Sequence, residues 1–167
     1  RDILSILHSV MKYASKQSLR PMAEIVYPKN NYQEIRTLTP GEHKAFTHYL
    51  LQDMDLCKFG TLLALMTGLR VGELCALRWR DISIDEAMIR VSATMQRIKA
   101  LDENADAKTK IVISSPKSRT SARFVPLTKQ ALALCRHYQS TDPNAFVLTG
   151  SADHFREPRA MQYRMKK

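Results

Sequence analysis

The stretch that decides the fold is TGLRVGEL, residues 67–74. It is continued by Leu77, Trp79, Asp81 and Ile82. Gly68 ends one apolar helical run, and Arg70 lies in the first turn of the next. Helix N-termini carry unpaired N–H groups and a partial positive charge, so a guanidinium added there creates an anion site. The planar guanidinium of Arg70 can also bind two phosphate oxygens at once, which suits a phosphate clamp. The alternative is an ordinary surface arginine.

The composition is that of one globular domain, or of a domain with part of a second attached. The chain has 167 residues, of which 44% are apolar and 25% are charged. Its three cysteines are too scattered for a disulfide framework or a zinc cluster. We therefore expect Cys57, Cys75 and Cys135 to be reduced and mostly buried, as in an intracellular, cytoplasmic protein. No apolar run is long enough to span a membrane and no signal pattern is present, which argues against a membrane partner.

Positive charge is the strongest compositional feature. Twenty-six Lys and Arg residues against sixteen Asp and Glu give a formal net charge of +10. A domain this basic attracts a polyanion, usually nucleic acid, although the charge can also serve solubility alone. Two segments concentrate it: Lys117, Arg119, Arg123 and Lys129 with no acid among them, and Arg156, Arg159, Arg164, Lys166 and Lys167 beside Glu157.

Hydrophobic periodicity and capping signals predict a mostly helical chain. Thr39 and Glu42 form a capping box with Pro40 at the first helical position, and Gly68 ends an apolar helix expected at the centre of the core. Thr128 is the expected N-cap of a later helix. The predicted helices cover residues 2–18, 40–52, 56–66, 70–77, 129–138 and a last segment from Pro158.

Between residues 82 and 127 the pattern changes to that of strands. Ile82 and Ile84 suggest a first strand. Asp85-Glu86 is expected to form the turn after it, and residues 88–98 one long strand. Together with runs at 110–113 and 123–127, this strand predicts a small three-stranded antiparallel β-sheet inside a mainly α domain. Residues 146–148 are expected to be a short strand or an extended piece.

Lys117 lies in a basic, acid-free turn between two predicted strands. At the tip of a hairpin, its ammonium can reach into a groove or towards a leaving group, where it can act as a general acid. The alternative is an edge-strand lysine that discourages aggregation.

Taken together, three stretches resemble the tyrosine recombinases, the integrases of phages and conjugative transposons. Residues 67–82 resemble the first catalytic box of that family, whose arginine binds the scissile phosphate; this position is Arg70. Residues 116–127 resemble the β-hairpin segment whose lysine is the general acid; this position is Lys117. Residues 38–42 resemble the opening of the catalytic domain.

The resemblance implies a tyrosine recombinase catalytic-domain fold of the DNA breaking-rejoining type, incomplete at its C-terminus. Residues 1–20 then correspond to the last helix of a core-binding (SAM-like) domain, and residues 21–36 to an interdomain linker. Residues 37–167 correspond to the N-terminal part of the catalytic domain.

The family's chemistry implies a tyrosine that attacks a DNA phosphodiester to give a 3′-phosphotyrosyl intermediate, with no metal and no cofactor. Glu73 is expected either to orient Arg70 or its neighbours or to be a capping or surface acid. The expected DNA contacts are Arg119, Arg123, Arg156 and Arg159. The implied partner is duplex DNA at specific recombination sites, bound by a homotetramer of the intact protein, and no small-molecule substrate is implied.

One part of the family pattern is missing. No His-x-x-Arg sequence follows Lys117, since neither His137 nor His154 is followed by arginine at the third position. Tyr138 and Tyr163 precede the place where that box would begin, so neither is assigned as the nucleophile. We therefore expect the segment alone to be inactive in DNA cleavage.

Other functions explain less. A non-catalytic DNA-binding or regulatory protein derived from the same fold is the main alternative. His43 and His48 are five residues apart, off a shared helical face, which argues against a metal pair. A metal-dependent nuclease needs more carboxylates than the turn at Asp85 supplies, and a purely structural helical module does not explain the acid-free turn around Lys117.

Overall fold

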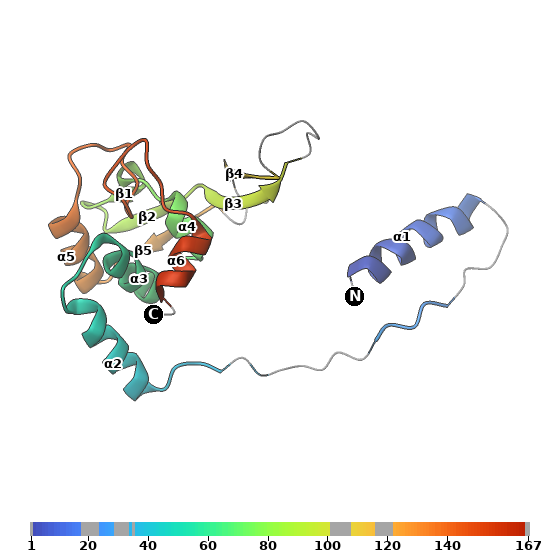
Figure 1. The fold of residues 1–167 in the computed structure, drawn as a ribbon, viewed down its shortest axis with the longest axis horizontal. Coiled ribbons are helices and arrows are strands. Elements are labelled where there is room, and N and C mark those ends of the chain that lie inside the picture. The colour runs from blue at the N-terminus through green and yellow to red at the C-terminus, as the bar shows by residue number, and fades with distance from the viewer. Residues whose placement is uncertain are drawn as a thin grey trace. The chain divides into compact units, whose positions relative to one another are not determined.

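The computed structural model describes residues 2–17, 24–28, 34, 36–100, 108–115 and 122–165. The chain divides into two units, Arg1–Thr37 and Leu38–Lys167. The first contains helix α1 (Asp2–Gln17), which Figure 1 shows in blue. None of the side chains of this helix is buried. Its apolar face includes Ile3, Ile6 and Val10, all exposed. The interpretation of this unit as the end of a core-binding domain with its linker stays a prediction.

The second unit contains five helices among its described residues. They are α2 (Pro40–Leu51), α3 (Leu56–Thr67), α4 (Val71–Ala76), α5 (Lys129–Tyr138) and α6 (Pro158–Met165), with a single 3₁₀ turn at Trp79–Asp81. The predicted capping box is confirmed, since Thr39 Oγ1 accepts from Glu42 N and Glu42 Oε2 accepts from Thr39 N. Gly68 ends α3 in the left-handed region at φ 68°, where glycine carries no Cβ penalty.

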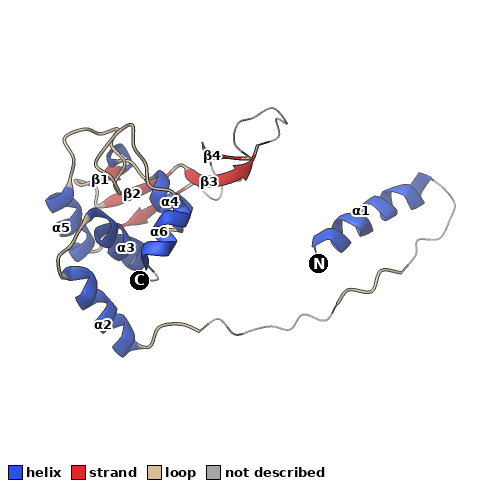
Figure 2. Ribbon diagram, viewed as in Figure 1, coloured by secondary structure: helices blue, strands red, loops and turns tan. Residues whose placement is uncertain are grey.

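The strands form two antiparallel sheets rather than one (Figure 2). The three-stranded sheet has the order β1 (Ile82–Ser83), β2 (Met88–Val91) and β5 (Arg123–Pro126), with Val91 opposite Arg123. The second sheet pairs β3 (Thr94–Lys99) with β4 (Thr109–Ser114).

The prediction of one long strand over residues 88–98 was therefore wrong. Ser92 Oγ donates to Asp81 Oδ1 over 3.1 Å, which ties the chain to the 3₁₀ turn where β2 ends. After this point the chain enters β3, where Met95 is buried in the core. The run at 110–113 consequently pairs with β3 in the second sheet. The third strand of the three-stranded sheet is β1.

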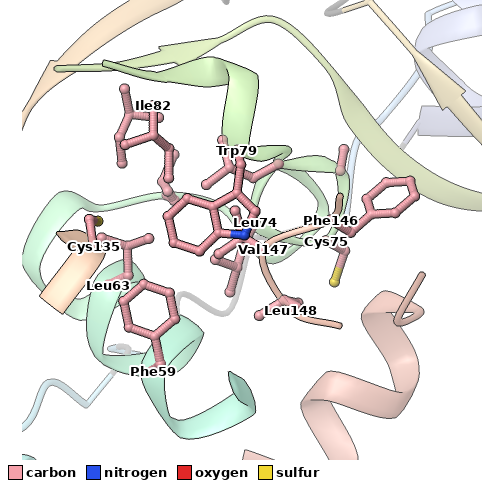
Figure 3. Close-up of a cluster of buried hydrophobic side chains, with 14 of the residues drawn as sticks. Phe59, Leu63, Leu74, Cys75, Trp79, Ile82, Cys135, Phe146, Val147 and Leu148 are labelled. Atoms are coloured by element: carbon pink, nitrogen blue, oxygen red, sulfur yellow. The ribbon is translucent and has the colours of Figure 1, made fainter. Parts of the chain in front are cut away.

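Helix α3 lies at the centre of the core, as its apolar sequence predicts. Its Phe59 is fully buried and stacks on Trp79 with ring centroids 6.1 Å apart (Figure 3). Trp79 is thus a packing residue. The extended piece at residues 146–148 is also buried and makes a single bridge from Phe146 to Arg78.

All three cysteines are free and buried, as expected. Burial raises the pKa of the Cys75 thiol to about 12 and that of Cys135 to about 11. Their thiolates are therefore scarce at neutral pH, and the two side chains act as small apolar groups in the core.

Gly72 fixes the distance between α4 and β3. A Cβ atom at this position would lie 2.7 Å from the Met95 carbonyl oxygen and 2.7 Å from Thr94 Oγ1. Since the first of these atoms belongs to the backbone of a strand, β3 would have to move. We predict that Gly72→Ala lowers the free energy of unfolding by about 1–3 kcal/mol.

Chemical unfolding of the whole chain measures this change. The matched control is Gly41→Ala in α2, where an added Cβ meets nothing within 4 Å. There the helix gains up to about 1 kcal/mol from the better helix former. Equal effects of the two substitutions would contradict the packing argument.

Candidate active site

Arg70 precedes α4 as its N-cap residue and does not lie within its first turn. Its backbone is extended, at φ −70° and ψ 150°, while its carbonyl oxygen accepts the first helical hydrogen bond from Leu74 N over 2.9 Å. The expectation that it occupies the first turn was therefore wrong by one residue. The N-cap position leaves 74% of the side chain exposed, which suits a group that receives an external anion.

Glu73 lies one turn into α4 and is 5% exposed. Its Oε2 accepts hydrogen bonds from the Arg70 backbone N–H and from Arg123 Nη2, both over 2.9 Å. Its Oε1 accepts from Arg70 Nη1 over 3.0 Å and from Arg123 Nη1 over 2.8 Å. One buried carboxylate thus joins the two arginines, and four charge-assisted or helix-cap hydrogen bonds offset its loss of water.

The surroundings of Glu73 keep it ionised. Burial alone raises the pKa of its carboxyl group, but hydrogen bonds from the Arg123 side chain and from the Arg70 backbone and side chain outweigh this effect. The result is a pKa of about 2, below the ordinary value of 4.5. Glu73 is therefore an anion throughout the neutral range, and it can orient a guanidinium but cannot donate a proton.

This lowered pKa predicts a pH-dependent contribution to stability. Because the folded pKa lies below the ordinary value, the contribution of Glu73 is complete above about pH 4.5 and is lost as the pH falls towards 2. At pH 7, we expect Glu73→Gln to cost about 1–3 kcal/mol of unfolding free energy. The difference from the parent chain should shrink in acid.

Urea unfolding at pH 7 and pH 3 measures the difference. Glu86→Gln, in the exposed turn between β1 and β2, is the control for loss of one carboxylate. A difference between parent and Glu73→Gln that stays constant across this pH range would show that the carboxylate is not held by the two arginines.

Arg123 opens strand β5 and reaches Glu73 across 50 residues of sequence. Sequence analysis assigned it to DNA contact, and its bidentate pairing with Glu73 had no local signal. Its side chain is 32% exposed, against 74% for Arg70. Direct DNA contact by Arg123 stays a prediction.

The remaining predicted site residues fall in different places. Lys117 and Arg119 lie outside the described residues. Arg159 is exposed on α6, which packs beside α4 (Figure 1), and it donates from Nε and Nη2 to the Tyr163 hydroxyl over 3.3 and 3.2 Å. It lines a groove with Val71 and Gly72, next to Arg70 in sequence.

Arg156 lies in another part of the surface. It lines a depression with Asp55 and Arg164, and this depression does not include Arg70. Its buried Nε has no hydrogen-bond partner among the described residues. The structure therefore brings Arg70, Glu73 and Arg123 together, with Arg159 beside the same helix, and leaves Arg156 apart.

An ion pair between β3 and the start of α6 was missed by sequence analysis. Arg97 Nη2 lies 2.6 Å and 2.7 Å from the two carboxylate oxygens of Glu157, and its Nη1 donates to Thr109 Oγ1 over 2.7 Å. Glu157 had been counted only as the one acid in a basic segment. Its partner lies 60 residues away, so only the fold could reveal it.

Within the described part of the chain, no group of three or more His, Cys, Asp or Glu side chains is placed to hold a metal ion. Among the same residues, no helix is both long enough and apolar enough to cross a membrane.

Residues 29–165 match the model of the phage integrase family. The chain belongs to this family. The match confirms the resemblance inferred from residues 67–82 and 116–127, and it spans both arginines that bind Glu73.

Two curated relatives are similar in sequence to part of this chain. A tyrosine recombinase XerC-like protein of Caldanaerobacter subterraneus subsp. tengcongensis is 31% identical over 90 residues, which cover 54% of this chain and 23% of that protein. The ICEBs1 integrase of Bacillus subtilis is 31% identical over 107 residues, which cover 64% of this chain and 27% of that protein. The chain thus spans about a quarter of the length of these relatives.

Solved structures share the fold. The Tn1549 transposon integrase in complex with circular intermediate DNA superposes with a TM-score of 0.66 at 16% identity, over 99% of this chain and 58% of that one. The same integrase in complex with transposon right end DNA superposes with a TM-score of 0.52 at 20% identity, over 66% of this chain and 33% of that one. The predicted fold class, a mainly α tyrosine recombinase catalytic domain, is confirmed, with two small antiparallel sheets where one was expected.

Proposed function

We propose that this chain forms part of the catalytic domain of a site-specific DNA recombinase, which cleaves and rejoins strands through a 3′-phosphotyrosyl intermediate. The observation that carries the proposal is the exposed guanidinium of Arg70 at the N-cap of α4. The buried Glu73 carboxylate accepts hydrogen bonds from the backbone N–H and from Nη1 of this arginine. Family membership supports the same reading.

In the proposed reaction, a tyrosine oxygen attacks the phosphorus of a DNA phosphodiester. A new oxygen–phosphorus bond forms, the bond to the 5′ oxygen breaks, and the leaving oxygen takes a proton. The phosphotyrosyl link conserves the energy of the broken phosphodiester bond, so a second strand can be rejoined without ATP. No tyrosine of this chain is assigned as the nucleophile, and none of the steps calls for a metal.

Arg70 acts as the clamp on the scissile phosphate. Negative charge builds up on the phosphoryl oxygens as the fifth oxygen approaches, and a fixed guanidinium at a helix N-terminus stabilises that charge without reorganising. Glu73 fixes the direction of the guanidinium through Nη1. In the hydrogen bonds among the described residues, Nε and Nη2 of Arg70 stay available for phosphate oxygens.

Lys117 acts as the general acid that protonates the leaving 5′ oxygen. It lies in the chain between β4 and β5, and the first residue of β5 is the Arg123 that binds Glu73. The strand that follows Lys117 in sequence is therefore anchored to the helix that Arg70 caps.

The partner that we propose is duplex DNA, bound at specific recombination sites by a homotetramer of the intact protein inside the cell. The net charge of +10 supports a polyanionic partner. The fold neighbours are integrases in complex with DNA, which supports the same assignment. Exposed basic residues such as Arg159 supply phosphate contacts, and Arg119 and Arg156 are the other proposed contacts. Both terminal nitrogens of Arg123 are already bound to Glu73.

A non-catalytic DNA-binding or regulatory protein of the same fold is the second candidate. It shares with the first candidate the family membership and the basic charge that support DNA binding. The two candidates differ in whether the Arg70 site contributes to strand cleavage.

Removal of either proposed catalytic group should separate cleavage from binding. In the full-length protein, we expect Arg70→Ala and Lys117→Ala each to lower the rate of covalent capture on a nicked suicide substrate by about 10²–10⁴-fold. Non-covalent DNA affinity should change little, because each variant removes one contact of many. Normal cleavage by both variants would refute the assigned roles.

The 167 residues by themselves should bind DNA without cleaving it. We expect the isolated chain to bind duplex DNA with an affinity that falls steeply as salt rises, by a log–log slope of about −0.9 per phosphate contact. No covalent complex should form with a suicide substrate. A gel-shift titration at several salt concentrations and denaturing electrophoresis make the two measurements, and covalent capture by this chain would overturn the expectation.

A further inference from the structure

Arg123 binds Glu73 more completely than Arg70 does. Both terminal nitrogens of Arg123 donate to the carboxylate, one to each oxygen, over 2.8 and 2.9 Å. Arg70 supplies one side-chain nitrogen over 3.0 Å and its backbone N–H. The parallel two-bond pairing of Arg123 is the stronger arrangement for guanidinium and carboxylate.

The side chains of Arg70, Arg123 and Glu73 together carry a net charge of +1. The buried negative charge of Glu73 is matched by Arg123, which is two thirds covered, so the charge of the exposed Arg70 remains for an external anion. A buried carboxylate with Arg70 as its single cation would draw that guanidinium into the same two-bond pairing. Fewer donors of Arg70 would then face a phosphate.

We propose that Arg123 is a positioning residue for strand cleavage: its fork occupies the Glu73 carboxylate and so keeps Arg70 directed at the scissile phosphate. This inference rests on the proposed role of Arg70, and it gives Arg123 a function within the protein instead of a phosphate contact. It also explains why a basic residue that opens a strand turns to a carboxylate 50 residues away.

A double-mutant cycle in the full-length protein tests the proposal. The variants are Arg123→Gln, Glu73→Gln and the two combined, with Arg136→Gln on the exposed side of α5 as the matched loss of one arginine. We expect Arg123→Gln to lower the covalent capture rate by about 10²-fold, since small misplacement of a catalytic group has effects of this size. In the Glu73→Gln background the same change should add little, because Arg123 acts through Glu73.

The salt dependence of non-covalent DNA binding separates the proposal from direct contact. A positioning residue leaves the slope unchanged, whereas loss of a phosphate contact reduces it by about 0.9. A reduced slope, or effects of Arg123→Gln and Glu73→Gln that multiply in the double variant, would overturn the proposal. Arg136→Gln should leave the capture rate unchanged.

Two further measurements cover the other outcomes. If Arg123→Gln does not fold, Arg123→Lys is the test variant, because lysine keeps the charge but cannot form the two-bond pairing with Glu73. A slower capture rate at an unchanged salt slope supports the positioning role of that pairing. A capture rate equal to that of the parent protein overturns it. The carboxyl resonance of Glu73 gives a readout without cleavage, because its pKa of about 2 should rise when Arg123 becomes Gln. That rise together with normal cleavage by Arg70→Ala would mean that the proposed function fails while the pairing is real.

Discussion

The carboxylate of Glu73 is the group on which the geometry of the site depends. It lies at the N-terminal end of a helix, where the helix dipole favours a negative charge, and four N–H groups from two residues surround it. Burial of this charge is unfavourable unless every partner is present. The arrangement therefore holds together as a whole: the N-cap backbone, the exposed guanidinium and the Arg123 side chain at the start of β5 all bind one anion.

Helix α4 is too short to be stable by itself. Its six residues form little more than one turn, and nucleation of a helix is costly, so its place must come from tertiary contacts. Leu74, Cys75 and Ala76 bury one side of it in the core. Gly72 lets the backbone of β3 approach the helix closely. The direction of Arg70 is thus fixed by the packing of α4 and by an ion pair with Glu73.

Local signals in the sequence predicted most helix boundaries. The capping box at Thr39, the glycine stop at Gly68 and the N-cap at Thr128 all depend on residues within four positions, and all three are present in the structure. The position of Arg70 differed by a single residue, because the residue that accepts the first helical hydrogen bond does not itself have helical dihedral angles.

Non-local pairings could not be predicted in the same way. The β2–β3 run has one continuous apolar pattern, and only the bond from Ser92 to Asp81 shows where it breaks. Arg70 was found through a family resemblance, which identifies a residue but not what holds it. The partner of Glu73 depends on strand order, since Arg123 faces the site only because β5 pairs with β2.

The pairing also changes how the basic composition is to be understood. Counting arginines treats each as a possible phosphate contact, yet Arg97, Arg123 and Arg164 each bind a carboxylate within the chain. Arg70 contacts a carboxylate as well, but it shares that anion with Arg123 and stays largely exposed. A basic residue is therefore informative about function when its local charge is unmatched. By that criterion the count of 26 Lys and Arg residues overstates the surface available to an anion, and Arg70 is the arginine of this site whose charge stays largely exposed.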